Sequence, residues 1–359
     1  MKKIVIKIGT GVLTGKGGNL DEEMIEQLVK QICGMIKSGI SVLLVSSGAI
    51  GAGMDLLGVK KRPNELSELQ SMAAVGQTRL MNIYNKYFNK NGYIAGQILL
   101  TQDDFDDRTR YINIKHTINA LLERKIIPIV NENDTISTEE IKCGDNDRIS
   151  ALLGDLVEAD TLVILTNVEG LLDREGKLIR SINDISDEIK SLVRKDKCAL
   201  GTGGMETKIN AAEFVTNSGI DCCIANGKSK DILLDILKGE GKFTYFKAKS
   251  IKVTAKKRWI GFGSKTKGAV IVDDGAKEAI SKGNKSLLAA GVIDKKGDFL
   301  SGDILSICDK SGKEFAKGIT NYSSSEILKI KGIKTKDIES ALGYKNQDEV
   351  IHRDNLVIL

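Results

Sequence analysis

Two patterns of hydrophobic and polar positions alternate along the first two-thirds of the chain. Short apolar or β-branched runs predict buried strands, and apolar residues spaced three and four apart predict helices. The predicted strands are 4–8, 42–45, 94–99, 126–130, 161–165 and 221–225, and the predicted helices are 21–37, about 65–90, 113–125, 149–159, one after 207 and one near 229–238. Strands that alternate with helices indicate an α/β fold, a three-layer αβα sandwich with a mostly parallel sheet.

The pattern changes after about Gly241. Segments become short and β-branched, with glycine and lysine between them. The predicted strands here are 269–272, 286–289, 291–293, 304–307, 314–319 and 355–358, with helices at 276–281 and 323–329. This predicts a small β-rich barrel or sandwich with one or two helices. We therefore expect a domain at 1–241, a linker at 242–266 and a second domain at 267–359.

Composition excludes several classes of protein. The chain has 359 residues and a formal net charge of +5, which does not by itself indicate a nucleic acid or membrane partner. Because no apolar run approaches the ~20 residues of a membrane span and the chain enters a strand at once, we expect a cytoplasmic protein without a signal peptide. Six cysteines without Cys-x-x-Cys spacing are expected to be reduced thiols. With two histidines only, neither a histidine-based triad nor a histidine-rich metal site is expected, and no metal ligands are assigned.

The most informative stretch is 126–150. An apolar run ends in Asn131–Asp134, and Gly144–Arg148 precedes the helix-patterned run. Six acidic residues and three asparagines lie in this polar loop. A generic acidic loop is more often simply solvated. Here the mixture of amides and carboxylates at a strand end favours a site for a small zwitterion or a phosphate-bearing substrate.

Three loops expected at strand ends are rich in glycine, at 9–11, 46–53 and 201–204. Glycine allows backbone N–H groups to approach a phosphate closely. Two lysines stand out beside these loops, Lys7 inside the first strand and Lys208 at the start of a helix. Two cations that converge on a phosphate would stabilise a transferring phosphoryl group, and Asp147 could hold them in place. Neither a P-loop nor a Gly-x-Gly-x-x-Gly motif is present.

The chain closely resembles the glutamate 5-kinase family, which belongs to the amino-acid-kinase superfamily and carries a C-terminal PUA domain. The matching segments span nearly the whole chain in order. They are Val5–Thr10, Val45–Ile50, Ala73–Gln77, Ile129–Asp134, Gly144–Asp147, Gly201–Met205 with Thr207 and Lys208, Lys257–Ile260, Leu342–Tyr344 and His352–Asp354.

The resemblance implies a reaction and a set of roles. ATP, with Mg²⁺, would phosphorylate the γ-carboxylate of L-glutamate to L-glutamyl 5-phosphate, the first step of proline biosynthesis. The implied catalytic residues are Lys7, Lys208 and Asp147. The implied glutamate-binding residues are Ser47, Asp134 and Asn146, with Asp145 close by. The implied ATP-binding residues are Lys7, Gly9, Thr10, Gly11, Thr166, Asn167, Thr202, Gly203, Gly204, Met205, Glu206, Thr207 and Lys208. The chain departs from the family's common residues at Gly11, Asn167 and Glu206, which concerns the nucleotide contacts.

Two alternatives remain open. A sister kinase of the same fold would act on aspartate, acetylglutamate, carbamate or a nucleoside monophosphate. A protein of another class would bind RNA through the PUA-like domain, with the basic stretch at 247–267 and Trp259 as support. A solvated linker accounts better for that stretch, because the net charge is small. The resemblance further implies proline as a feedback inhibitor, at the glutamate site near 51–70, and a homo-oligomer, dimer or tetramer.

Overall fold

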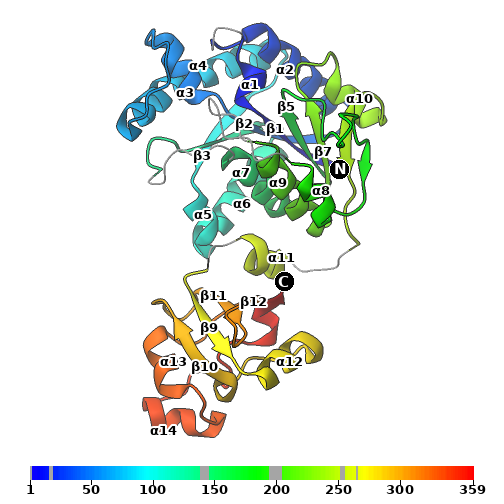
Figure 1. The fold of residues 1–359 in the computed structure, drawn as a ribbon. Helices are drawn as coiled ribbons and strands as arrows, with labels where there is room; N and C mark the ends of the chain where they lie inside the picture. The colour runs from blue at the N-terminus through cyan, green and yellow to red at the C-terminus, as the bar shows by residue number, and fades with distance from the viewer. Residues whose placement is uncertain (1, 16–18, 138–144, 194–203, 251–254, 264–265) are drawn as a thin grey trace. The chain divides into compact units, whose positions relative to one another are not determined.

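The computed structural model describes the chain except for residues 1, 16–18, 138–144, 194–203, 251–254 and 264–265 (Figure 1). Contacts between Cα atoms divide the chain into two compact units, Met1–Ile251 and Lys252–Leu359.

The first unit is built on one large sheet with the strand order β3-β4-β2-β1-β5-β7-β8-β6. All neighbouring strands run parallel except β7 and β8, which are antiparallel. The strands are β1 (Lys3–Ile8), β2 (Ser41–Ser46), β3 (Ala95–Leu100), β4 (Ile127–Glu132), β5 (Thr161–Thr166), β6 (Ser181–Ile182), β7 (Asp221–Asn226) and β8 (Phe243–Phe246).

Helices cover both faces of this sheet, which gives the three layers seen in Figure 1. One layer holds α1 (Thr10–Leu13), α2 (Glu22–Lys37), α3 (Ala49–Leu56), α4 (Leu66–Lys90) and α10 (Ile232–Lys238). The other holds α5 (Gln102–Asp106), α6 (Arg108–Glu123), α7 (Asp145–Leu156), α8 (Asp187–Ser191) and α9 (Met205–Asn217). The pleat assigns alternate residues of each strand to the two layers: Ile4, Ile6 and Ile8 pack in the core with α2 and α4.

The three-layer α/β fold predicted from the sequence is confirmed. Local features of helix α7, of Pro128 and of two short strands add to that prediction. Helix α7 begins at Asp145, so Asn146 and Asp147 lie in a first helical turn rather than in the loop that the sequence predicted. Acidic residues are stabilised there by the helix dipole. Pro128 fits inside a central strand because β2 pairs with β4 only at Ile129 and Val130. The short strands β6 and β8 were not predicted.

The second unit contains a five-stranded sheet in the order β10-β9-β11-β12-β13. Its own hydrophobic core includes the fully buried Tyr322 and Ile307. The segment predicted as strand 286–289 pairs only through a single bridge, from Leu287 to Ile351. The strands are β9 (Gly268–Val272), β10 (Val292–Lys296), β11 (Ile304–Cys308), β12 (Glu314–Ile319) and β13 (Leu356–Ile358). The helices are α11 (Ala255–Arg258), the π-helix η1 (Trp259–Gly263), α12 (Asp274–Gly283), α13 (Ser324–Ile330) and α14 (Ile338–Leu342), with 3₁₀ turns η2 (Ala289–Gly291), η3 (Thr335–Asp337) and η4 (Arg353–Asn355).

The domain boundaries given by the sequence remain a prediction. Strand β8 lies within the range assigned to the linker, and so do α11 and η1. The segment 242–266 therefore contains ordered elements of both units.

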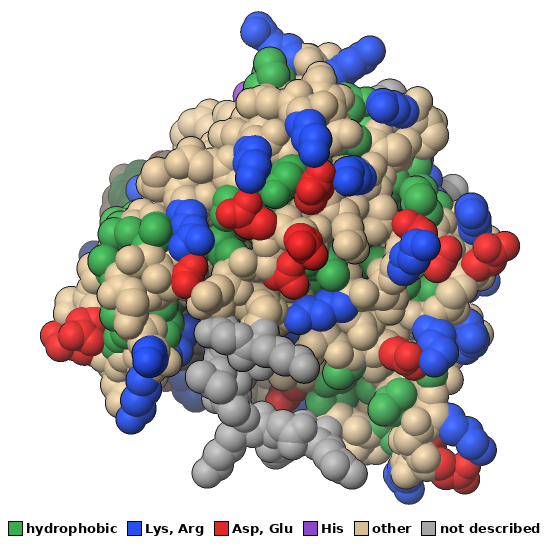
Figure 2. Space-filling view, turned by 90° about the horizontal axis from the view of Figure 1, so that it is seen from above, with side chains coloured by type: hydrophobic (Ala, Val, Ile, Leu, Met, Phe, Trp, Pro, Cys, Tyr) green, Lys and Arg blue, Asp and Glu red, His purple; other side chains and the backbone are tan. Residues whose placement is uncertain are grey.

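Helix length and surface charge bear on whether a membrane or a nucleic acid could be a partner. No helix within the described ranges combines the length and apolar character needed to cross a membrane. On the face shown in Figure 2, cations and acids are interspersed, and ion pairs such as Lys86–Glu22 and Lys90–Glu26 join α4 to α2. Of the six cysteines, Cys33, Cys222, Cys223 and Cys308 are described, and all four are buried free thiols; Cys143 and Cys198 lie outside the described residues.

Candidate active site

Lys7 is a charged and buried residue of the sheet. It sits in β1 with β2 on one side and β5 on the other, and its partners across the two ladders are Val45 and Ile164. The pleat directs Lys7 to the face opposite Ile6 and Ile8, which is the face covered by α7 and α9. Its side chain is only about one-twentieth exposed. A lysine so placed needs a buried partner.

That partner is Asp147, in the first turn of α7. Its Oδ1 lies 2.7 Å from Nζ of Lys7, and its Oδ2 lies 3.2 Å from Nζ of Lys208 on α9. The hydroxyl of Thr207 donates a second bond to Oδ2, at 2.7 Å. Asp147 is fully buried and Lys208 is 4% exposed. One carboxylate thus holds two ammonium groups side by side, as the sequence predicted.

The protonation of this cluster follows from its neighbours. Burial by itself would raise the pKa of Asp147, but the charges of Lys7 and Lys208 and the hydrogen bonds to the carboxylate lower the pKa below its usual value. The carboxylate is therefore ionised at neutral pH. Two ammonium groups and one carboxylate therefore meet in a site shielded from water, and two converging cations favour an anion between them.

The loop after β1 brings the backbone close to this charge. The N–H of Gly9 donates to the carbonyl of Leu165 at 3.0 Å, and α1 begins directly afterwards at Thr10. A Cβ on Gly9 would lie 3.2 Å from that carbonyl oxygen and 3.5 Å from Nζ of Lys7. Glycine therefore leaves room beside the ammonium group, and a phosphate oxygen could occupy it. Thr10 and Gly11 are half-buried in the same turn.

A chain of amides adjoins the lysine pair on the side of β2. Nδ2 of Asn146 donates to the hydroxyl of Ser47 at 3.0 Å and to Oδ1 of Asn131 at 3.0 Å. Asn131, at the end of β4, donates to Oε1 of Gln77 at 2.7 Å. The backbone N–H of Ser47 in turn donates to the carbonyl of Ile8, next to Lys7. Because Asn146 and Asp147 are consecutive, the polar chain and the lysine pair form one site.

The remaining candidate residues differ in how deeply they are buried and in whether the structure describes them. Thr166, at the end of β5, is buried, and its hydroxyl donates to Oδ1 of Asn167 at 3.3 Å. Asp134 is half-buried in the turn after β4. Gly204 is the N-cap of α9, followed by half-buried Met205 and exposed Glu206. Thr202 and Gly203, and the side chain of Asp145, lie outside the described residues.

Two further residues join the site without having been assigned a role from the sequence. Gln77 is 8% exposed and Asn131 is 1% exposed, and they orient each other and Asn146. A signal for Gln77 was available. It is a polar residue in the apolar stripe of α4, one turn after Ala73 and one before Met81. Such a residue needs a hydrogen-bond partner from another element.

Among the described residues, side chains that could bind a metal ion do not gather into a cluster. No group of three or more His, Cys, Asp or Glu residues there is placed to hold a metal ion. A Mg²⁺ ion commonly takes one or two carboxylates together with substrate phosphates and water.

Comparisons with known proteins agree with this geometry. The amino acid kinase family model matches residues 2–226, and the PUA domain model matches residues 268–342. Glutamate 5-kinase of Thermoanaerobacter sp. (strain X514) is 48% identical over 363 residues, 99% of this chain and 98% of its own length. Glutamate 5-kinase of Moorella thermoacetica is 44% identical over 364 residues, 100% of this chain and 96% of its own.

A solved structure supports the fold. Carbamate kinase from Giardia lamblia, bound to AMP-PNP, superposes with a TM-score of 0.51 at 18% identity, over 69% of this chain and 99% of that one. At this identity the likeness concerns the fold alone. The full-length relatives carry the finer assignment: the chain belongs to the amino acid kinase family and, within it, to the glutamate 5-kinases.

Proposed function

We propose that the protein transfers the γ-phosphoryl group of ATP to the γ-carboxylate of L-glutamate and releases ADP and L-glutamyl 5-phosphate. The observation that carries the proposal is the buried Lys7–Asp147–Lys208 cluster beside the amide chain. The relatives named glutamate 5-kinase, similar over their whole length, supply the substrate. The same relatives make a sister kinase or an RNA-binding protein the weaker account.

The chemistry needs no general base. A γ-carboxylate is already ionised at neutral pH, so a carboxylate oxygen forms the new bond to phosphorus while the bond from phosphorus to the leaving ADP oxygen breaks. No proton changes place. Catalysis then depends on alignment and on compensation of charge. Lys7 and Lys208 would stabilise the transferring group, and Asp147 would keep both ammonium groups aimed at it.

Glutamate would bind at the amide chain. Ser47 and Asn146 present a hydroxyl and an amide from the ends of β2 and α7, and Asp134 lies in the turn after β4. A carboxylate can accept hydrogen bonds from Ser47 and Asn146, and an ammonium group can be held by Asp134. Glutamate bound in this way would lie next to Lys7, and its γ-carboxylate could attack the phosphoryl group from there.

ATP would lie at the ends of β1 and β5. The opening beside Gly9 fits a phosphate, and Gly11, Thr166, Asn167 and residues 202–208 are the proposed nucleotide contacts. Mg²⁺ would enter bound to the phosphates and neutralise part of their charge. The chain's own residues would hold the γ-phosphoryl group in line with the acceptor carboxylate.

The test is a hydroxamate assay on the purified protein. With MgATP and L-glutamate, hydroxylamine should trap the acyl phosphate as γ-glutamyl hydroxamate, with one ADP formed for each glutamate consumed. Aspartate, N-acetylglutamate and carbamate serve as matched acceptors. Hydroxamate from aspartate or N-acetylglutamate but not from glutamate would contradict the substrate assignment, and ATP turnover independent of any acceptor would contradict the reaction.

Proline as an inhibitor, a homo-oligomeric state and a cytoplasmic location remain proposals from the resemblance. An inhibitor of the size of proline could take the part of the amide chain that recognises the amino and carboxyl groups of glutamate. Competition between proline and glutamate in the same assay tests the shared site.

A further inference from the structure

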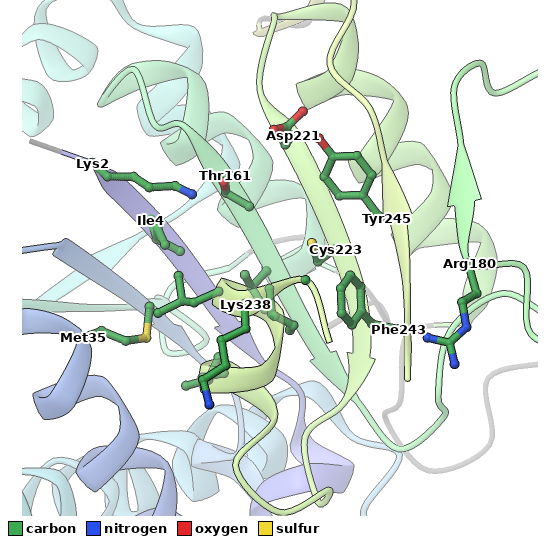
Figure 3. A pocket seen from close by; sticks show the side chains of 15 residues that line it. Lys2, Ile4, Met35, Thr161, Arg180, Asp221, Cys223, Lys238, Phe243 and Tyr245 are labelled. Carbon is green, nitrogen blue, oxygen red and sulfur yellow. The ribbon is translucent and has the colours of Figure 1, made fainter. Parts of the chain in front are cut away.

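A cavity lies at the amino ends of β1, β5 and β7 (Figure 3), whereas Lys7 lies near the carboxyl end of β1. It has a volume of about 550 Å³ and is bounded by the first residues of β1, β5 and β7, by β8, and by α2 and α10. A strand rises about 3.3 Å per residue, so some 17 Å of β1 separates Lys2 from Lys7. Cavities of 300–1,000 Å³ are the usual size for small-molecule sites.

The pleat explains why polar groups meet here. Lys2, Thr161 and Asp221 stand at or just before the starts of β1, β5 and β7, in the same alternation as the apolar residues that face α2 and α10. The helices cover the middle of that face and leave its edge open. The wall below the polar edge is apolar, with Ile4 and Phe243 among its members.

Two groups on the polar edge lack protein partners. Within the described residues, the Thr161 hydroxyl has no hydrogen bond and the Lys2 ammonium forms no ion pair. Thr161 is 8% exposed, and Figure 3 shows the Lys2 amine directed toward it. Burial raises the pKa of the neighbouring Cys223 thiol to about 12, and the charge of Lys2 lowers it by a smaller amount.

The one carboxylate of the cavity is already engaged. Oδ1 of Asp221 accepts from the N–H of Ala248 at 2.9 Å. Lys2, Arg180 and Lys238 outnumber it three to one on the lining. The cavity therefore has a positive excess, a free donor pair at one end and an apolar wall.

We propose that this cavity binds a small organic anion with an apolar body, such as an arylalkyl carboxylate. Its carboxylate accepts hydrogen bonds from Lys2 and Thr161, and its apolar part packs against Phe243 and the apolar side chains of α10. The site is separate from the catalytic centre and does not depend on the reaction assigned to that centre.

Isothermal titration calorimetry with the full chain tests the proposal, using 3-phenylpropionate, its uncharged amide 3-phenylpropionamide, and L-phenylalanine as probes. We expect the acid to bind one per chain and the amide to bind about tenfold more weakly, because a charge-assisted hydrogen bond is lost. Saturating glutamate with Mg²⁺ and AMP-PNP should leave the binding unchanged. Absence of binding by the acid, equal binding of acid and amide, displacement by glutamate, or tighter binding of L-phenylalanine would each overturn the proposal.

Variants locate the site. Lys2→Met and Thr161→Val should each lower the affinity for 3-phenylpropionate about tenfold. Ile236→Trp should abolish binding, because the larger side chain fills the apolar end of the cavity. Lys242→Met is the control, because it also replaces a lysine by methionine, at the residue before Phe243. Lys242 pairs with Glu169 at 2.9 Å and is not among the residues that line the cavity. The affinity of this variant for 3-phenylpropionate should equal that of the parent chain. A loss in Lys242→Met as large as that in Lys2→Met would overturn the assignment. Because the Lys2 side chain is exposed, that variant is expected to fold.

Discussion

At the scale of single residues, Asp147 sets the charge of the catalytic centre. It lies between Lys7 and Lys208 at 2.7 and 3.2 Å and accepts a further bond from Thr207. Without it, two buried ammonium groups would repel each other and lose their orientation. With it, both ammonium groups stay close together, which suits a transferring phosphoryl group whose charge is spread over its three equatorial oxygens.

Replacing either lysine should therefore affect the chemical step. In Lys7→Ala and in Lys208→Ala we expect kcat to fall by about 10²-fold or more, the scale of one lost charge stabiliser, with a much smaller change in KM for glutamate. Steady-state kinetics with glutamate and ATP varied separately give the two constants. Lys190→Ala is the control, because Lys190 forms an exposed ion pair with Glu213. Near-normal kcat together with impaired folding would assign the lysine a structural role.

Gln77 should act as a positioning residue for glutamate. Its Oε1 accepts from Asn131, whose own Oδ1 accepts from Asn146. In Gln77→Leu the Asn131 amide loses its acceptor, and an unsatisfied buried donor costs about 1–3 kcal/mol. We expect KM for glutamate to rise about tenfold, with little change in KM for ATP.

Gln77→Glu separates orientation from packing. The glutamate side chain keeps an acceptor for Asn131 at the same place, so KM should recover toward the parent value while the leucine variant stays impaired. An equal rise in KM for both substrates, or no rescue by Gln77→Glu, would mean that Gln77 serves the fold only.

The lysine cluster could be predicted from the sequence, and the amide chain could not be completed from it. A lysine inside a β-branched run and a lysine that opens a helix are both anomalous for local reasons, which the sequence alone reveals. The bond from Gln77 to Asn131 joins α4 to β4 across 54 positions. Within its own segment, each residue is noticeable only because it is polar. Which residue it pairs with depends on how α4 packs against β4, and the sequence pattern does not show that packing.

At the scale of elements, the close approach of α3 and α4 positions the glutamate side of the site. Helix α3 begins just after Ser47, and α4 carries Gln77. A Cβ on Gly76 would lie 1.8 Å from the carbonyl oxygen of Ala49, and one on Gly53 would lie 1.9 Å from that of Met72. The helices touch backbone to backbone, and only glycine permits it.

We expect Gly76→Ala to force these helices apart. Overpacking of this kind costs about 1–3 kcal/mol or more, and the shift of Gln77 and Ser47 should raise KM for glutamate. Gly34→Ala on α2 is the matched control, since its Cβ would meet nothing within 4 Å. Removing a helix-interior glycine there should stabilise the protein by about 0.5–1 kcal/mol. Thermal melts and glutamate titrations measure both effects, and a Gly76→Ala protein as stable as the parent would contradict this account.

Element boundaries show where sequence patterns lose information. The range predicted for the long helix at 65–90 agrees with α4, because its apolar stripe is continuous. Helix α7 begins four residues before the predicted start, since Asp145–Arg148 carry no apolar signal. Strand β8 has four residues and β6 has two, and their strand state depends on pairing with each other and with β7.

At the scale of the whole first unit, the sheet separates two kinds of site. The carboxyl ends of β1, β2, β4 and β5 deliver Lys7, Ser47, Asn131 and Thr166 to the catalytic centre, as open α/β sheets commonly do. The amino ends of β1, β5 and β7 form the cavity with Lys2 and Thr161. A ligand at one end contacts strands that also carry residues of the other.

The first unit extends beyond β8. Strand β8 pairs with β7 from Cys222 to Ala225 and with β6 at Ser181. Thr244, fully buried, accepts a hydrogen bond from the N–H of Leu171. Beyond β8, the N–H of Lys249 donates to the carbonyl of Thr216. The fold of this unit therefore uses the chain as far as Lys249.

We expect a protein of residues 1–250 to fold and to keep glutamate-dependent ADP release, because every described contact of the catalytic centre lies within it. A protein of residues 1–241 is the matched comparison. It loses β8 and exposes the edge of β7, so it should unfold without a cooperative melt or aggregate. Circular dichroism and a thermal melt establish folding before activity is measured. If the 1–250 protein folds but is inactive, the second unit contributes to catalysis; if the 1–241 protein is as stable as the 1–250 protein, β8 is dispensable and the first unit ends earlier than the sheet indicates.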